Sequence, residues 1–218
     1  MKKNKITVFL SAFFILLAAV FSYLYYNASK QMKKSDLVVM TEPGDGIRSF
    51  SFLNQEGETV TNEDIKDKVA VVEFFFTTCK GICPKMNENM TKVYQAFRSD
   101  DDVVILSHTV DPKRDTVAAL KAYSLRFDAD PKRWMFLTGD KKEIYDQARL
   151  SYKVSAGDTT ALDIESDFIH TNVFVLVDKY GRLRVRLDEE GNPDPYDGTN
   201  EKSVAQLIKD IHQLKLEE

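Results

Sequence analysis

The chain has 218 residues, 29% of them charged, and this length allows a membrane segment together with one domain that has a sizeable core. The formal net charge is -4, and removing the three lysines that precede the apolar segment (Lys2, Lys3 and Lys5) leaves -7 for the remainder. An acidic domain without a basic patch argues against nucleic acid as a partner.

The first predicted element is a membrane-spanning helix from Ile6 to Tyr26, which is apolar apart from one threonine and two serines. As a helix, this segment spans roughly 30 Å, the thickness of the hydrocarbon core of a bilayer. A cleaved signal peptide is the alternative, but the run is long for one and no convincing small-x-small cleavage site follows it. We therefore predict an uncleaved transmembrane anchor at residues 6–26, preceded by a short basic N-terminus at residues 1–5.

The orientation of this anchor is predicted from the charges on its two sides. Three lysines stand on each side: Lys2, Lys3 and Lys5 before it, and Lys30, Lys33 and Lys34 after it. The count of basic residues is therefore nearly balanced, and the N-terminal amine favours an N-terminus inside the cell. The chain is then predicted to be single-pass in the cell membrane, with its soluble domain on the extracytoplasmic (periplasmic) side.

Residues 27–47 are predicted to form a linker, which is polar at first and rich in turn-forming residues from Pro43 to Gly46. The domain follows at residues 48–218, where apolar strands alternate with amphipathic helices. The predicted strands are a short hairpin (49–53 with 60–61), the run that starts at Val69, and 103–108, 134–137, 173–177 and 183–187. Helical periodicity runs from Met86 to Phe97, Val117 to Phe127, Ile144 to Ala148 and Val204 to Leu214, and Thr199 or Asn200 caps the last helix. This order predicts an α/β fold, and a thioredoxin-like fold, with a central mixed β-sheet flanked by helices, is the simplest arrangement that fits.

The two cysteines of the chain, Cys79 and Cys83, lie where the strand from Val69 gives way to the helix that contains Met86. Pro84 directly follows the second cysteine, and proline suits the first position of a helix. Both sulfurs are then at or near a helix N-terminus, where unpaired N–H groups and the helix dipole favour the thiolate form. Because thiolate is both a nucleophile and a metal ligand, the sequence predicts a functional sulfur site.

A structural disulfide is the simpler alternative for two cysteines outside the cytoplasm. The loop between Cys79 and Cys83 is very short, so closing it would remove little entropy from the unfolded chain and would stabilise the domain weakly. A close cysteine pair at a strand-to-helix junction is more often redox-active or metal-binding. The spacing alone does not distinguish these two functions.

A third ligand would favour metal binding, and the chain contains three histidines. His212 is expected on the solvated face of the last helix, and His108 is expected to be a satisfied structural residue at the end of an apolar strand. His170 lies in a polar connection before a strong predicted strand, where loop residues often carry function. Two thiolates and one imidazole suit Cu(I), whereas tetrahedral zinc would need a fourth ligand. The helical register of Met86 and Met90 predicts that both methionines belong to the core.

Four segments resemble the SCO/SenC family of copper-binding assembly proteins. Thr77 to Pro84 looks like its Cys-x3-Cys-Pro signature, and Val110 to Thr116 is similar to its Asp-Pro-x-Arg-Asp-Thr segment. Leu137 to Gly139 matches its Leu-Thr-Gly. His170, followed by a strand and then Asp178-x-x-Gly181-Arg182, stands where the family has its histidine ligand.

The four matches occur in the family's order and cover most of the chain from Phe50 to Ile211. The N-terminal membrane anchor is also a feature of the family. The chain departs from the family pattern in two places. Ile169 stands where the family usually has Asp before the histidine, with Asp167 further back, and an acidic insertion from Asp188 to Pro195 lengthens the link after the second hairpin strand.

The resemblance implies a thioredoxin-like domain that binds a copper ion, Cu(I) or Cu(II), through Cys79, Cys83 and His170. It also implies a function in building the binuclear copper (CuA) site of a respiratory cytochrome c oxidase. The implied partners are the copper-site subunit of that oxidase and an upstream copper donor or thiol reductant. Arg114 and Asp115 need no chemistry of their own, since Asp115 is expected to cap a helix and Arg114 to be a surface or loop-pinning charge.

Two functions from different classes remain open. A metallochaperone would bind copper, dock on the oxidase subunit and pass the ion on by ligand exchange, without being an enzyme. A thiol-disulfide reductase would use Cys79 or Cys83 to attack an oxidised cysteine pair on the target, and the other cysteine would resolve the mixed disulfide. Only the metal function requires His170, so this residue distinguishes the two.

Overall fold

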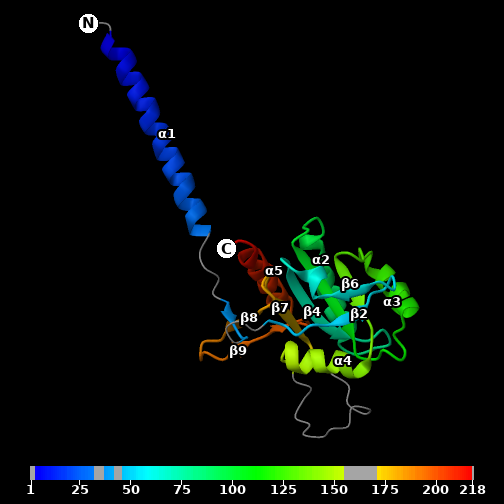
Figure 1. Cartoon of the computed structure of the whole chain (residues 1–218). Helices are drawn as coiled ribbons and strands as arrows, with labels where there is room; N and C mark the ends of the chain where they lie inside the picture. Colours follow the sequence, from blue (N-terminus) through cyan, green and yellow to red (C-terminus); the bar gives the residue numbers. More distant parts are fainter. Residues whose placement is uncertain (1–2, 32–36, 42–45, 155–170, 218) are drawn as a thin grey trace.

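The computed structural model describes residues 3–31, 37–41, 46–154 and 171–217 of the chain. Its N-terminal helix α1 (Lys3–Gln31) extends as a rod away from an α/β domain that contains all the other elements (Figure 1). Within α1, the stretch Thr7–Leu24 is long and apolar enough to cross a membrane, and the domain buries none of it. The predicted apolar helix is therefore present as a candidate anchor.

A central mixed sheet organises the domain, with the strand order β1-β8-β7-β4-β5-β6. Its strands are β1 (Val38–Val39), β4 (Val69–Phe75), β5 (Val103–Thr109), β6 (Trp134–Leu137), β7 (Val173–Val177) and β8 (Leu183–Leu187). Strands β4, β5 and β6 are parallel to one another, whereas β7 is antiparallel to β4 and β8 is antiparallel to β7. The predicted α/β fold with a central mixed sheet is confirmed.

Four shorter strands lie around this sheet. Strands β2 (Ser51–Leu53) and β3 (Thr59–Thr61) form the short hairpin that the sequence predicted. The acidic insertion after β8 is more than a link, because it contains β9 (Pro193–Asp194), which pairs with β8. Directly after the insertion, β10 (Tyr196–Asp197) pairs with β7.

Helices cover both faces of the sheet. One face packs against α2 (Cys83–Phe97), α3 (Val117–Ser124) and α5 (Glu201–Lys215), and the other packs against α4 (Lys141–Asp146) and the β2–β3 hairpin. Three short turns complete the fold: η1 (Asn62–Ile65), η2 (Leu125–Phe127) after α3, and the π-helical η3 (Gln147–Ser151) after α4. The N-cap of α5 is Asn200, whose side chain accepts hydrogen bonds from two backbone N–H groups, so of the two predicted caps Asn200 is the one used.

Every residue of β4 is buried, because both faces of this strand are covered. Val71 and Phe75 contact the core beneath α2 and α5, whereas Val72 and Phe74 contact the core beneath α4. Successive side chains of a strand point to opposite faces, so Glu73 shares the face of Val71 and Phe75. The one charged residue of β4 therefore lies in the core on the side of α2.

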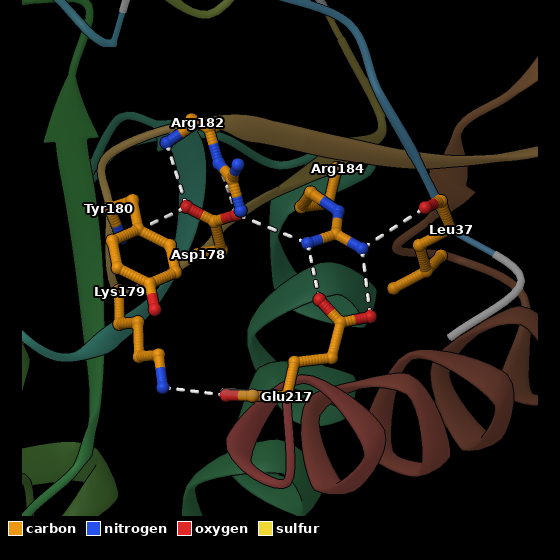
Figure 2. A network of polar contacts seen from close by, with 7 residues as sticks. All are labelled: Leu37, Asp178, Lys179, Tyr180, Arg182, Arg184 and Glu217. Carbon is orange, nitrogen blue, oxygen red and sulfur yellow. Dashed lines mark hydrogen bonds and ion pairs between the residues drawn. The ribbon is translucent and has the colours of Figure 1, made fainter. Parts of the chain in front are cut away.

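A buried arginine in β8, Arg184, links the segment before β1, at Leu37, to the segment after α5, at Glu217 (Figure 2). Its side chain is 5% exposed and binds both Asp178, in the turn between β7 and β8, and Glu217, at 3.1 and 2.7 Å. It also donates to the backbone carbonyl of Leu37, at 3.0 Å. Because β1 then pairs with β8, residues 37–41 of the predicted linker are fastened to the sheet, whereas residues 27–31 of it continue α1.

Candidate metal centre

The two cysteines lie at the junction of β4 and α2, as the sequence predicted. Cys79 is half-buried, and its N–H donates to the carbonyl oxygen of Phe76 at 3.1 Å. Cys83 is 4% exposed and is the first residue of α2, so Pro84 is the second helical residue rather than the first. Both thiols are free, and Cys79 lies close enough to Cys83 to raise the pKa of its thiol. Two soft ligands therefore stand side by side at the start of a helix.

The expected preference for thiolate is wrong for Cys83 in the metal-free protein. Burial raises the pKa of its thiol to about 12, and the neighbouring Cys79 and Glu73 act in the same direction. A backbone hydrogen bond from Phe76 lowers the pKa, but burial outweighs it. Because a metal ion binds only the thiolate, it has to displace this proton when it enters the site.

The loop before Cys79 is held by Asp115, which does not cap a helix as expected. The N-cap of α3 is Thr116, whose hydroxyl oxygen accepts from the N–H of Ala119. Asp115 is 1% exposed and accepts a hydrogen bond from the N–H of Thr77 at 3.1 Å and from its hydroxyl at 2.5 Å. It also accepts from the hydroxyl of Thr109 at 2.5 Å. The carboxylate thus ties the cysteine loop to the end of β5, a function that sequence reasoning missed.

Arg114 fits the expected surface charge. Its side chain is 72% exposed, and its guanidinium lies 3.6 Å from the carboxylate of Asp111. An ion pair this exposed contributes little to stability. The neighbouring Asp115 and Arg114 therefore differ completely in burial and in function.

His170 lies outside the described residues. The described chain resumes at Thr171, directly before β7. Strand β7 runs antiparallel to β4, with Val175 opposite Val72, so β7 starts at the edge of the sheet where β4 ends and the cysteine loop begins. Within the described part of the chain, no three His, Cys, Asp or Glu side chains cluster as a metal site.

The other two histidines lie away from the cysteines. His108 is fully buried on the opposite face of the sheet, where its ring stacks on Phe74 with centroids 5.3 Å apart. Its Nε2 lies 3.4 Å from the hydroxyl of Tyr152, but its Nδ1 has no hydrogen-bond partner among the described residues. The prediction of a fully satisfied histidine is therefore wrong at that nitrogen, and burial lowers the pKa of the ring to about 3. His212 is exposed on α5, as predicted, with its ring 4.7 Å from that of Phe97.

The two methionines of α2 are core residues, as the helical register predicted. Met86 is 1% exposed and Met90 is fully buried. Both belong to the apolar cluster that includes Cys83. Their thioethers are therefore packed in the core rather than presented to a metal.

Glu73 is a second residue that sequence reasoning missed. It is fully buried, and one of its carboxylate oxygens accepts from the hydroxyl of Ser107 at 2.6 Å, which in turn accepts from the indole N–H of Trp134 at 2.8 Å. The other oxygen has no partner among the described residues. Burial raises the pKa of this carboxyl group to about 7. The sequence did contain a signal for this residue, because Glu73 is the single acidic residue in the otherwise apolar strand β4.

The raised pKa of Glu73 predicts a dependence of stability on pH. The unfolded chain ionises Glu73 near pH 4.5 and the folded domain only near pH 7, so the free energy of unfolding falls as the pH rises between these values. Glu73→Gln should remove this slope, so its stability relative to the native protein should improve by about 2 to 3 kcal/mol between pH 5 and pH 8. Urea unfolding of both proteins at the two pH values measures the difference.

Comparing variant with native protein at each pH cancels the opposite slope from His108, whose lowered pKa makes the domain less stable as the pH falls below 6.5. A relative stability that is the same at pH 5 and pH 8 would show that Glu73 ionises normally in the folded domain.

The match to a known family decides how this site is to be understood. A family model described as SCO1/SenC matches residues 39–204, which include both cysteines, Asp115 and His170. The chain belongs to the SCO1/SenC family. The resemblance predicted from the four sequence segments is confirmed.

Several SCO1/SenC relatives are similar over most of their length. The SCO1 protein homolog of Bacillus subtilis (strain 168) is 33% identical over 153 residues, which cover 69% of this chain and 77% of the relative. The structure of BsSco, described as a member of the Sco family of cytochrome c oxidase assembly proteins with a disulfide switch, is 28% identical, with a TM-score of 0.63, over 81% of this chain and 97% of that one. Copper-bound ScoI of Bradyrhizobium japonicum is 28% identical, with a TM-score of 0.57, over 76% and 99% of the two chains. These likenesses confirm the predicted thioredoxin-like fold.

Proposed function

We propose that this chain is a copper metallochaperone that holds copper through Cys79, Cys83 and His170 and delivers it to the binuclear copper (CuA) site of a respiratory cytochrome c oxidase. The observation that carries this proposal is the pair of free thiols at the junction of β4 and α2, with Cys79 in the connecting loop and Cys83 at the first position of the helix. Two adjacent sulfurs provide the soft, low-coordinate environment that Cu(I) prefers. The copper-bound ScoI structure of the same family supports copper as the metal.

The third ligand is proposed from chain connectivity. His170 immediately precedes Thr171, and β7 starts at Val173, at the sheet edge where β4 ends. An imidazole there would complete the three-ligand set that the family resemblance implies.

The two sulfurs differ in access, which gives the transfer a direction. Cys79 is half-buried and lines an open cleft, whereas Cys83 is packed in the core cluster. Ligands of an acceptor protein can therefore reach copper from the side of Cys79. Ligand exchange would begin there, with Cys83 as the last sulfur to release the ion.

A thiol-disulfide reductase remains the second candidate, because an accessible thiol beside a buried one also suits disulfide exchange. The Cys79 thiolate would attack a disulfide of the partner, forming a mixed disulfide and releasing one partner thiol. Cys83 would then attack the Cys79 sulfur, which releases the second partner thiol and leaves a Cys79–Cys83 disulfide. The partner gains two electrons, and a dithiol reductant has to restore the pair. The disulfide switch described for BsSco supports this reading.

We also propose that α1 is an uncleaved anchor and that the domain lies on the extracytoplasmic side. The apolar stretch Thr7–Leu24 supports the anchor, and the lysines on its two sides with the N-terminal amine support the orientation. Retention of the full chain in membranes after an alkaline carbonate wash tests the anchor, and digestion of the domain by protease added to spheroplasts tests the orientation. A mature protein that starts after Tyr26 would contradict the anchor.

His170→Ala separates the two functions, because it leaves both thiols in place. In a strain that lacks the native gene, we expect this variant to fail to restore oxidase activity, nearly as completely as Cys79→Ser. His212→Ala, which removes an exposed imidazole from α5, is the matched control and should restore activity fully. With protein levels shown to be equal, full activity of His170→Ala would favour the reductase.

A further inference from the structure

An open cleft of about 540 Å³ lies beside Cys79. Its walls come from the cysteine loop, the first turns of α2, and the end of α3 with η2, and its volume is in the range of sites that hold small ligands or short peptide segments. Among the described residues that line it are two cations, Lys80 and Arg126, and no carboxylate. This described lining is therefore positively charged, in a chain whose residues beyond the first five carry a net negative charge.

Both cations of the cleft lack a carboxylate neighbour among the described residues. Other basic side chains of the domain form ion pairs with neighbouring carboxylates, among them Lys85, Lys92, Arg98, Lys121, Arg133 and Lys142. Lys80 and Arg126 are both exposed, and neither forms an ion pair within the described part of the chain. Two charges that no described carboxylate pairs with thus lie beside Cys79 in the lining of the cleft.

The position of Arg126 is fixed without a carboxylate. Its guanidinium lies over the ring of Tyr123, 5.2 Å from the centroid. The hydroxyl of Tyr123 in turn accepts from the side-chain amide of Asn87 in α2, at 3.1 Å. Arg126 is therefore held at the cleft by the α2–α3 contact while its N–H donors remain available for an incoming anion.

We propose that this cleft is the docking site for an acidic, cysteine-containing segment of the acceptor protein, with Lys80 and Arg126 binding carboxylates that flank the acceptor cysteine. The proposal rests on the proposed transfer function, because transfer requires the acceptor's ligands to lie next to Cys79. Charge complementarity at such an exposed site acts mainly on the rate and selectivity of association. The domain's overall negative charge repels an acidic partner, and the two cations offset this repulsion next to Cys79.

The test uses the full-length protein in detergent micelles, reduced and free of metal. Two dye-labelled peptides of equal length carry serine at the cysteine position, flanked by four aspartates in one peptide and by four lysines in the other. Fluorescence anisotropy should show that the aspartate peptide binds at least about tenfold more tightly, and that added salt weakens this binding. The double variant Lys80→Glu with Arg126→Glu should reverse the preference, and Lys80→Gln with Arg126→Gln should abolish it.

Lys209→Glu is the matched control, since Lys209 is exposed on α5 and forms no ion pair with a described residue. It should leave the preference unchanged. Equal binding of both peptides, an unchanged preference in the double variants, or equally strong competition by plain acetate would each overturn the proposal. A further outcome is that the native protein self-associates, that the double variants lose this self-association, and that no protein prefers either peptide. That result would assign the cleft to a second copy of the chain and would also overturn the proposal.

Copper retention by the same variants, measured by competition with a Cu(I) chelator, distinguishes a failure of the proposed docking site from a failure of the proposed copper function. We expect all variants to retain copper as the native protein does, because neither cation is a proposed ligand. Copper retention without a peptide preference refutes the docking site and leaves the copper function standing. A peptide preference in a protein that binds no copper supports the acidic docking site and refutes the copper function.

Discussion

Replacing Cys83 by serine is expected to lower the affinity for Cu(I) by at least about a thousandfold, which corresponds to about 4 kcal/mol. The variant loses one of two soft ligands, and a hydroxyl group is a poor replacement for a thiolate at a Cu(I) site. Cys79→Ser should have an effect of the same size for the same reason. Competition between the reduced protein and a chromogenic Cu(I) chelator measures both affinities.

Met90→Leu is the control for sulfur in this region, because Met90 is fully buried in the same cluster as Cys83. The substitution nearly conserves volume, so the fold should tolerate it and copper affinity should stay unchanged. Circular dichroism on every variant checks that the domain is folded. A Cys83→Ser protein that is folded and binds copper as tightly as the native protein would refute the proposed ligand set.

Replacing Arg184 by leucine is expected to destabilise the domain by about 3 kcal/mol, because it leaves two carboxylates without their common partner. The side chains of Asp178 and Glu217 are 4% and 20% exposed, so water can compensate only in part. The melting temperature should fall by about 6 to 12 °C, measured on the full chain in detergent by near-ultraviolet circular dichroism.

Arg182→Leu is the control for this second experiment. Arg182 pairs with the same Asp178, but its side chain is 36% exposed and it contacts neither Leu37 nor Glu217 in the network of Figure 2. Exposed ion pairs contribute about 1 kcal/mol or less, so the loss should be much smaller. Equal losses in the two variants would contradict the central position of Arg184.

The helices and the longer strands of this fold could be predicted because each has a local signal, whereas the two-residue strands β1, β9 and β10 were not predicted. The apolar run from Val69, the proline after Cys83 and the alternation in the first hairpin all act over a few neighbouring residues. The dipole at a helix N-terminus is also a local effect, which is why sequence reasoning applied it to the thiols. Desolvation of Cys83 is the larger effect, and it depends on how deeply α2 packs on the sheet.

The polar contacts behind the site could not be read from neighbouring residues. Asp115 binds Thr77, 38 positions away, and the two meet only because β4 and β5 are parallel neighbours that end at the same edge. A helix cap was the nearest local explanation for such an acidic residue. Likewise, the unpartnered nitrogen of His108 follows from the aromatic side chains that several distant segments pack around it. Non-local packing decides these features.

The hydrogen bond between Leu37 and Arg184 fixes where the segment that connects α1 to the domain ends, and therefore how long that segment is. Six Cα–Cα steps separate Gln31, the last residue of α1, from Leu37, and they span at most about 22 Å. Seven further helical residues, with a rise of about 10 Å, separate Gln31 from the end of the apolar stretch at Leu24. With α1 as the anchor, Leu37 is thus confined to a layer about 30 Å deep above the bilayer. The domain would search for its acceptor by lateral diffusion in two dimensions, and an acceptor site much farther from the lipid surface would stay out of reach.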